Sequence, residues 1–161
     1  MKRISLIDFI KLSQNQKKMI LNWRNSDSIR KWMYSNKPIE LTSHFEFIEK
    51  LKNDKFNKYF LVQEEAINVG VIYFINIDSS LEECEFGIYA KPNSKGFGKI
   101  LIKSTINYAF NHLKIRRLIA EVLVENNIAI NLYTKFGFKQ VVKKLVDTRE
   151  VFVMELINEN R

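Results

Sequence analysis

A break between a strand and a helix near the middle of the chain constrains the fold more than any other feature. Residues 83–90 read as a strand, and Pro92 ends the run. Gly96 and Gly98 follow, at the start of an amphipathic stretch, residues 98–113, whose apolar side chains recur at helical spacing. Two glycines at the beginning of a helix leave backbone N–H groups uncovered, and the helix dipole adds partial positive charge. The pattern predicts a cradle for a pyrophosphate.

The spacing of the glycines excludes two common nucleotide-binding loops. A dinucleotide-binding turn needs a third glycine at position 101, which is Leu101. The phosphate-binding loop of nucleoside triphosphatases ends in Gly-Lys followed by Ser or Thr, a sequence that this turn lacks. What remains is Gly-x-Gly after a strand, which is also compatible with an ordinary strand-to-helix turn.

A second strand and helix follow about 20 residues further on. Residues 118–124 are rich in strand-forming side chains. Asn126 suits the N-cap of a short helix, and Gly137, which precedes Phe138, suits the left-handed position that ends it. The chain therefore repeats the order strand, turn, helix within about 55 residues.

Together these two units resemble the signature of the GNAT superfamily of N-acetyltransferases. Residues 93–98 occupy its first half, Arg/Gln-x-x-Gly-x-Gly/Ala, with Asn93 in the place of the usual Arg or Gln. The resemblance implies an α/β (mixed α+β) fold with a central, mixed, twisted sheet of about seven strands and about four to five flanking helices. In that fold the fourth and fifth strands splay apart, and the pantetheine arm of acetyl-CoA, the co-substrate, lies in the gap. No metal is implied.

The length of 161 residues suits one domain. We expect a single GNAT domain over residues 1–161, with acceptor recognition in about 1–80 and acetyl-CoA binding in about 81–161. The expected helices are residues 14–25, 27–34, 42–53, 98–113 and 128–136, and the expected strands are residues 2–8, 58–64, 69–78, 83–90, 118–124, 138–146 and 151–157.

Composition limits the compartment and the partners that we expect for this protein. We expect no transmembrane helix, because no run of about 18 apolar residues occurs, and we expect a cytoplasmic protein, because no signal peptide is recognisable. Cys84 is the single cysteine, so an internal disulfide is impossible. The net charge of +8 suits anionic ligands such as coenzyme A. The lysines are dispersed along the chain, so we expect no nucleic-acid partner.

Acetyl transfer from a thioester requires stabilisation of the carbonyl oxygen and a proton for the departing thiolate. In the family, a backbone N–H of the fourth strand meets the first need, and by position this is the stretch Ile88, Tyr89 and Ala90. Tyr133 resembles the family tyrosine that protonates the sulfur. The alternatives are that Tyr89 and Tyr133 only pack against the core.

The acceptor amine must also lose a proton, and Glu121 is the candidate group. It interrupts an apolar strand, where a charge is costly unless it has a role or a partner, and it shares a face with Ile119 and Leu123. We assign it as the base or as the group that orients the amine. The alternative is a surface carboxylate paired with a lysine, and Glu83 and Glu85 are the competing carboxylates.

The resemblance assigns further residues to acetyl-CoA. Phe136 is expected near the thiol end or the adenine side. The full set of predicted contacts is Ile88, Tyr89, Ala90, Asn93, Ser94, Lys95, Gly96, Phe97, Gly98, Lys99, Asn126, Ala129, Tyr133 and Phe136.

The first half of the chain carries the acceptor signal. The residues around Trp23, Arg24 and Tyr34 resemble two groups of the family, one acting on ribosomal-protein N-termini or polyamines and one on nucleotide-linked amino sugars. Over nearly the whole chain the pattern resembles the bacterial N-acetyltransferases of pseudaminic acid synthesis for flagellin glycosylation. Their acceptor is the 4-amino group of UDP-4-amino-4,6-dideoxy-N-acetyl-β-L-altrosamine.

That resemblance implies a nucleotide-sugar partner. Arg24 would bind the diphosphate, Tyr34 or Phe47 would stack on uracil, and His44 would meet hydroxyl groups. The full set of predicted acceptor contacts is Arg24, Met33, Tyr34, His44, Phe47 and Tyr89.

Three alternatives stay open at this point: a protein N-terminal acetyltransferase, a polyamine acetyltransferase, and an acyl-CoA-binding module that has lost catalysis. A homodimer is a further expectation.

Overall fold

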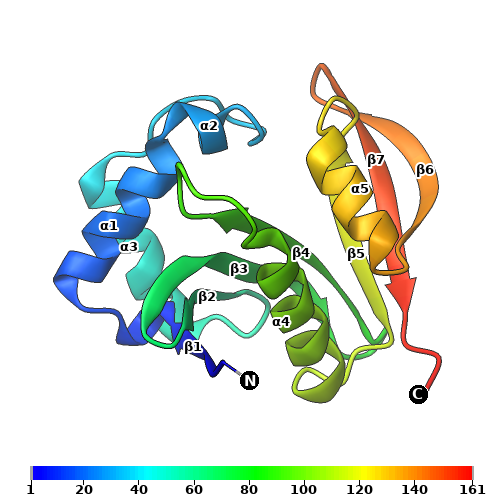
Figure 1. Cartoon of the computed structure of the whole chain (residues 1–161), viewed down its shortest axis with the longest axis horizontal. Helices are drawn as coiled ribbons and strands as arrows, with labels where there is room; N and C mark the ends of the chain where they lie inside the picture. Colours follow the sequence, from blue (N-terminus) through cyan, green and yellow to red (C-terminus); the bar gives the residue numbers. More distant parts are fainter. Residues whose placement is uncertain (1, 161) are drawn as a thin grey trace.

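The computed structural model describes residues 2–160, and it places a seven-stranded sheet between two layers of helices (Figure 1). The strands lie in the order β1-β2-β3-β4-β5-β7-β6, and every neighbouring pair is antiparallel except β4 and β5. The predicted mixed α/β fold with a central sheet of about seven strands is confirmed. The elements are β1 (Ile4–Asp8), α1 (Gln14–Asn25), α2 (Asp27–Arg30), α3 (Leu41–Lys50), β2 (Lys58–Glu64), β3 (Ile67–Asp78), β4 (Glu83–Ala90), α4 (Gly98–Asn111), β5 (Arg117–Leu123), α5 (Asn127–Lys135), β6 (Lys139–Val146) and β7 (Arg149–Ile157).

Alternation along the central strands divides the core into two layers. On β2, Phe60 and Val62 point to the face that α4 covers, and Leu61 points to the opposite face, where α1 and α3 pack. The first layer also receives Phe86 of β4. Because the central strands are buried on both faces, their apolar runs are nearly continuous.

The pairing of β4 with β5 ends after three residues. Glu83 pairs with Arg117, Cys84 with Leu118, and Glu85 with Ile119, and beyond these positions the two strands separate. Both strands continue past this point, so a gap opens in the middle of the sheet (Figure 1). The predicted splay of the fourth and fifth strands is therefore confirmed.

An ion-pair cluster holds the closed end of this gap. Arg117 Nη1 donates to Glu83 Oε2 of β4 at 3.2 Å, and its Nε donates to Glu155 of β7. One guanidinium thus ties β5 to both of its neighbours at the first of the three paired positions, two residues before β4 and β5 separate.

Most elements lie within three residues of their predicted bounds, and α2 is the main exception. The sequence pattern predicts a helix over residues 27–34, but the helix ends at Arg30. The guanidinium of Arg149, at the beginning of β7, donates to the carbonyl oxygens of Met33 at 3.1 Å and Lys31 at 3.3 Å. Beyond Arg30, Trp32 and Met33 keep turn-type bonds to Ile29 and Arg30. The Arg149 bonds hold residues 31–34, which we call the strap, against the other half of the sheet (Figure 1).

The described residues were compared with the requirements of a membrane-spanning helix and of a metal site. Within residues 2–160, no helix is both long and apolar enough to cross a membrane. In the same part of the chain, no group of three or more His, Cys, Asp and Glu side chains could hold a metal ion.

Replacing Arg117 by Met should lower the free energy of unfolding by about 1 to 2 kcal/mol, because two half-buried carboxylates lose a charged hydrogen-bond donor. Urea denaturation measures the change. Arg116→Met is the matched control, since the Arg116 side chain is exposed. Equal stabilities of the two variants would show that the cluster does not hold the closed end of the gap.

Candidate active site

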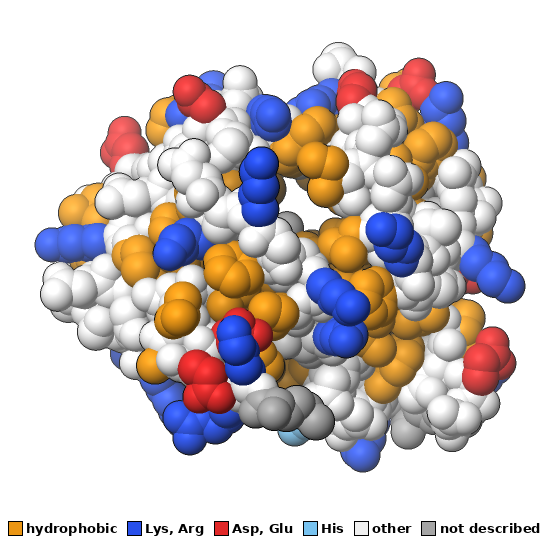
Figure 2. Space-filling view, viewed as in Figure 1, with side chains coloured by type: hydrophobic (Ala, Val, Ile, Leu, Met, Phe, Trp, Pro, Cys, Tyr) orange, Lys and Arg blue, Asp and Glu red, His pale blue; other side chains and the backbone are white. Residues whose placement is uncertain are grey.

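The gap between β4 and β5 forms a cleft of about 400 Å³. Figure 2 shows an opening between the two halves of the molecule, with hydrophobic side chains on its rim. The cleft brings together both strands, α5 and the strap. Its walls include these predicted acetyl-CoA and catalytic residues: Ile88, Tyr89, Ala90, Asn93, Ser94, Gly98, Glu121, Asn126, Ala129 and Tyr133.

The turn at the mouth of the cleft has the backbone that an anion needs. Gly96 adopts a positive φ of 84°, and Asn93 adopts one of 60°. Helix α4 begins at Gly98, and no side chain caps the N–H groups of its first turn. These groups and the helix dipole suit a pyrophosphate, so the turn fits acetyl-CoA.

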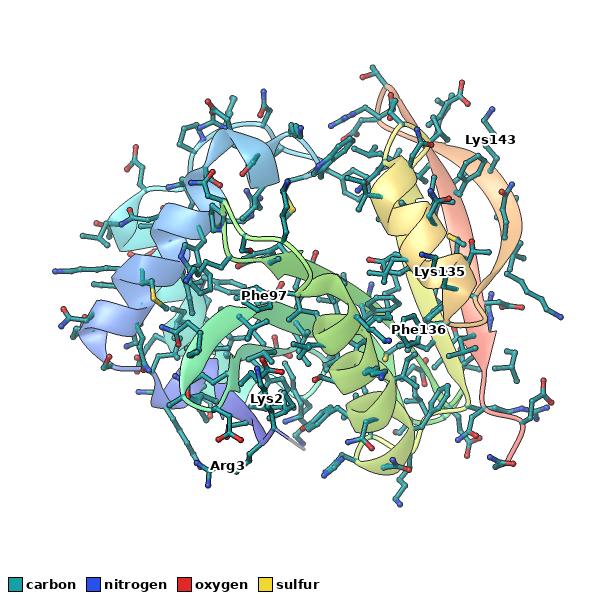
Figure 3. The ribbon with its side chains drawn as sticks, in the orientation of Figure 1. Lys2, Arg3, Phe97, Lys135, Phe136 and Lys143 are labelled. Atoms are coloured by element: carbon teal, nitrogen blue, oxygen red, sulfur yellow. The ribbon has the colours of Figure 1, made fainter. Side chains whose placement is uncertain are left out.

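The left-handed backbone at position 93 suits Asn, which stands there in place of the usual Arg or Gln of the family signature. A left-handed backbone is tolerated better by Asn than by most other side chains. Lys95, Phe97 and Lys99 belong to the turn but do not line the cleft, and Phe97 lies at the beginning of α4 (Figure 3). Gly96 likewise acts through its backbone, since nothing lies within 4 Å of the place where its Cβ would be.

Tyr133 enters the cleft from α5. Asn126 caps this helix by accepting a hydrogen bond from the N–H of Ala129 at 3.2 Å. The Tyr133 ring packs edge-on against Phe86, with ring centroids 5.3 Å apart, and against Phe138 at 5.6 Å. Burial raises the pKa of the phenol well above its usual value, so Tyr133 stays protonated at neutral pH. Its hydroxyl has no hydrogen-bond partner within residues 2–160.

Glu121 lies on the face of β5 opposite to α5, and two side chains hold its carboxylate. The Tyr34 hydroxyl donates to Oε1 at 2.5 Å, and the Lys144 ammonium of β6 lies 2.6 Å from Oε2. Burial raises the pKa of Glu121, but the bonds from Lys144 and Tyr34 outweigh it and hold the pKa below its usual value. The group therefore stays ionised, which suits an orienting role better than proton uptake.

The competing carboxylates have other surroundings. Glu83 is engaged by Arg117 at 3.2 Å. Burial, followed by the charge of Glu121, raises the pKa of Glu85, but Glu85 lines neither the cleft nor the cavity described next. Glu121 is thus the carboxylate that the fold places in the cleft.

A second cavity, of about 410 Å³, adjoins the cleft on the Glu121 face of the sheet, and we call it the acceptor cavity. It contains every residue predicted to contact the acceptor: Arg24, Met33, Tyr34, His44, Phe47 and Tyr89. The sequence analysis missed its other walls: Phe9, Ile39, Tyr59, Tyr73 and Ile75. Alternation along β2 and β3 is the signal that could have placed Tyr59 and Tyr73 on one face.

Arg24 is the cation of the acceptor cavity. Its Nη1 is buried and has no hydrogen-bond partner within residues 2–160. No Asp or Glu of that same range lines the cavity. Burial raises the pKa of Tyr59, Tyr73 and Tyr89, and the positive charge of Arg24 acts against this rise. A buried guanidinium without a partner is costly and therefore points to an anionic ligand.

His44 has a defined protonation state. Its Nε2 lies 2.9 Å from the carbonyl oxygen of Lys17, which can only accept, so Nε2 carries the proton. Burial lowers the pKa of His44 below its usual value, so the ring is neutral at physiological pH. The other ring nitrogen, Nδ1, is then a hydrogen-bond acceptor on the cavity wall.

Two aromatic residues are exceptions to the predicted set of site residues. Phe136 does not reach the cleft, and it lies between the end of α5 and the outer side of α4 (Figure 3), lining a separate surface hollow with Lys103 and Phe110. Trp32 of the strap, which is not among the predicted site residues, lines the cleft.

Comparison with known proteins agrees with this geometry. Residues 9–139 match the acetyltransferase (GNAT) domain family. The chain is 42% identical to the acetyltransferase PseH of Campylobacter jejuni strain 81-176, over 84% of each sequence. The crystal structure of C. jejuni N-acetyltransferase PseH in complex with acetyl coenzyme A superposes with a TM-score of 0.80, at 34% identity, and covers 98% of this chain and 100% of that one.

A second group of enzymes shares the fold. Spermidine N-acetyltransferase from Vibrio cholerae, solved in complex with CoA and spermine, matches with a TM-score of 0.84 at 24% identity, and covers 96% of this chain and 95% of that one. At this identity the likeness concerns the fold alone.

Glu121→Gln should reduce stability in a pH-dependent way. Because the folded-state pKa is lowered, the ionised carboxylate stabilises the protein above the ordinary carboxyl pKa of about 4.3, and this contribution is lost as pH falls through the lowered pKa. We expect the wild type to be more stable than the variant at pH 7, with the difference shrinking below about pH 4.3. Urea unfolding across pH measures this, and exposed Glu125→Gln is the control. A difference independent of pH would contradict the assignment.

Proposed function

The chain belongs to the GNAT acetyltransferase family, and we propose that it transfers the acetyl group of acetyl-CoA to the 4-amino group of UDP-4-amino-4,6-dideoxy-N-acetyl-β-L-altrosamine. This reaction is a step of pseudaminic acid biosynthesis, which supplies flagellin glycosylation. The observation that carries the proposal is the unpaired, buried Nη1 of Arg24 inside an aromatic cavity. A nucleotide sugar offers a diphosphate to the guanidinium and a flat base to the aromatic walls.

The same cavity argues against a polyamine. A polyamine is a chain of cations, and it needs carboxylates along its path. Within residues 2–160, the acceptor cavity has no acidic wall residue, and Glu121 in the adjoining cleft is already bonded to Lys144. The net charge of +8 would further repel such a ligand.

The two faces of the sheet would divide the chemistry. The acetyl thioester would lie in the cleft, with its oxygen near the backbone of Ile88, Tyr89 and Ala90. The acceptor amine would arrive from the acceptor cavity, on the face that carries Glu121, and its lone pair would attack the carbonyl carbon. The N–C bond forms, the C–S bond breaks, and the proton that the amine nitrogen loses passes to solvent water on the face that carries Glu121, which orients the amine.

Tyr133 would complete the transfer from the other face. Its protonated, unpartnered phenol can donate to the departing sulfur, so that coenzyme A leaves as a thiol. Both substrates react directly in one ternary complex. No covalent acetyl-enzyme is needed, and burial raises the pKa of the Cys84 thiol to about 12, which keeps it unreactive.

Thiol release from acetyl-CoA tests the acceptor. The purified protein is offered the UDP-amino sugar, spermidine, and a ribosomal N-terminal peptide in parallel. We expect turnover with the sugar nucleotide alone. Turnover with spermidine or the peptide in its place would overturn the proposed acceptor, and tight acetyl-CoA binding without any turnover would indicate another amino sugar or a lapsed enzyme.

Arg24→Met sharpens this test. Losing the charged contact to the diphosphate should raise KM for the UDP-sugar by about 10- to 100-fold, with KM for acetyl-CoA unchanged. Arg3→Met, at an exposed position, is the matched control. An unchanged KM for the sugar would show that Arg24 does not bind the diphosphate.

Tyr133→Phe should lower kcat by at least about 10-fold, because the leaving thiolate loses its proton donor. Binding of acetyl-CoA should be unchanged, since the ring still packs against Phe86. Tyr108→Phe is the control, because Tyr108 packs on α4 against Phe60 and Phe74, away from the cleft. Full turnover of the Tyr133 variant would exclude it as the general acid.

A further inference from the structure

The side chain of Tyr73, on β3, lies over Gly87 of the neighbouring strand β4. Tyr73 pairs with Gly87 of β4, and a Cβ placed on Gly87 would lie 2.1 Å from both the hydroxyl oxygen and Cζ of Tyr73. The ring therefore occupies the space that a side chain at position 87 would fill. Its hydroxyl lies over the β4 backbone at Gly87, and both residues line the cleft.

The hydroxyl thus reaches the place where the two strands have just separated. The last pair between β4 and β5 joins Glu85 to Ile119, so Gly87 and Glu121, each two residues further on, lie across the gap from each other on one face. Tyr73 lines both the cleft and the acceptor cavity, a property that it shares with Met33 and Tyr89. Tyr73 therefore lies where the acceptor cavity and the cleft meet.

The Tyr73 ring is held firmly, but its hydroxyl is unused. The ring stacks on Tyr59 at 4.9 Å with an interplanar angle of 13°, and Phe47 packs edge-on against Tyr59 at 4.9 Å. Within residues 2–160, no group hydrogen-bonds to the Tyr73 hydroxyl. Burial raises its pKa, so it stays a neutral phenol that can orient a ligand but does not remove its proton.

We propose that Tyr73 is a further catalytic residue, whose hydroxyl oxygen accepts a hydrogen bond from the acceptor amine and holds the nitrogen at the thioester carbonyl. The inference rests on the proposed function to the extent that the acceptor is a primary amine. Such an amine has two N–H bonds and one lone pair. If the N–H bonds point to Tyr73 and Glu121, the lone pair is directed into the cleft. Each Glu121 oxygen retains a free lone pair for this bond beside those it gives to Tyr34 and Lys144.

Tyr73→Phe is the first test, because it removes the oxygen and keeps the ring stacked on Tyr59. We expect kcat to fall about 10- to 100-fold, while KM for acetyl-CoA changes less than about 2-fold. The shape of the pH–rate profile should not change, because the phenol does not titrate near neutral pH. Tyr108→Phe is the matched control. A Tyr73→Phe enzyme with wild-type kcat would reduce Tyr73 to a wall residue and overturn the proposal.

Gly87→Ala tests the geometry independently. The added methyl group should displace the Tyr73 ring and lower kcat by a similar factor. In a Tyr73→Ala background the ring is absent, so adding Gly87→Ala should cost no further activity. Thermal unfolding and acetyl-CoA binding report whether each variant is folded. Losses that multiply in the double variant of folded protein would contradict the proposed orientation of Tyr73.

A second acceptor tests the role of Tyr73 whichever sugar is the true substrate. If the wild type ignores the UDP-amino sugar, the proposed acceptor is wrong, but the role of Tyr73 is still measurable with hydroxylamine at high concentration. This small nucleophile needs nothing from the acceptor cavity except the place of its nitrogen. Tyr73→Phe should slow acetyl transfer to hydroxylamine about 10-fold or more, and an unchanged rate would overturn the proposal.

Discussion

The end of pairing between β4 and β5 is the constraint on which the rest of the site depends. Three residue pairs join the strands, and beyond them neither strand has a partner in the gap. Unpaired backbone N–H and C=O groups inside a protein need other partners, and the extended pantetheine arm of acetyl-CoA offers amides that could serve. Arg117 holds the paired end of the two strands together, by binding Glu83 on one side and Glu155 on the other.

Around the gap, a proton donor lies on one face of the sheet and a carboxylate lies on the other, because strand residues alternate between faces. Side chains on the α4 and α5 face surround Tyr133, whose buried phenol keeps its proton. Side chains on the other face include Glu121, whose charge is held by Lys144 and Tyr34. A proton donor for the sulfur and an anion near the amine can coexist about one sheet thickness apart because β-strand residues alternate between faces. The strap joins the two halves of the sheet at the open end of the gap.

Local patterns predicted much of this arrangement. The bounds of β4 agree with the expectation, because strand alternation, Pro92 and the glycine turn are properties of short segments. The mixed fold and the splay of β4 and β5, which the family resemblance implied, are also confirmed. The residues assigned to the acceptor proved to share one cavity. Phe136 lines the hollow beside α4 instead of the cleft, so its contact with acetyl-CoA stays a prediction.

The sequence by itself determined the order of elements, the uncapped beginning of α4 and the charge excess, since each depends on neighbouring residues or on simple counts. Only the tertiary structure decided that α2 ends at Arg30 and that the strap is bonded by Arg149, more than a hundred residues away. It also decided that Tyr73 lies over Gly87 and that Glu121 is shared by Tyr34 and Lys144. These contacts join distant segments, and strand register and packing, which no local pattern contains, bring them together.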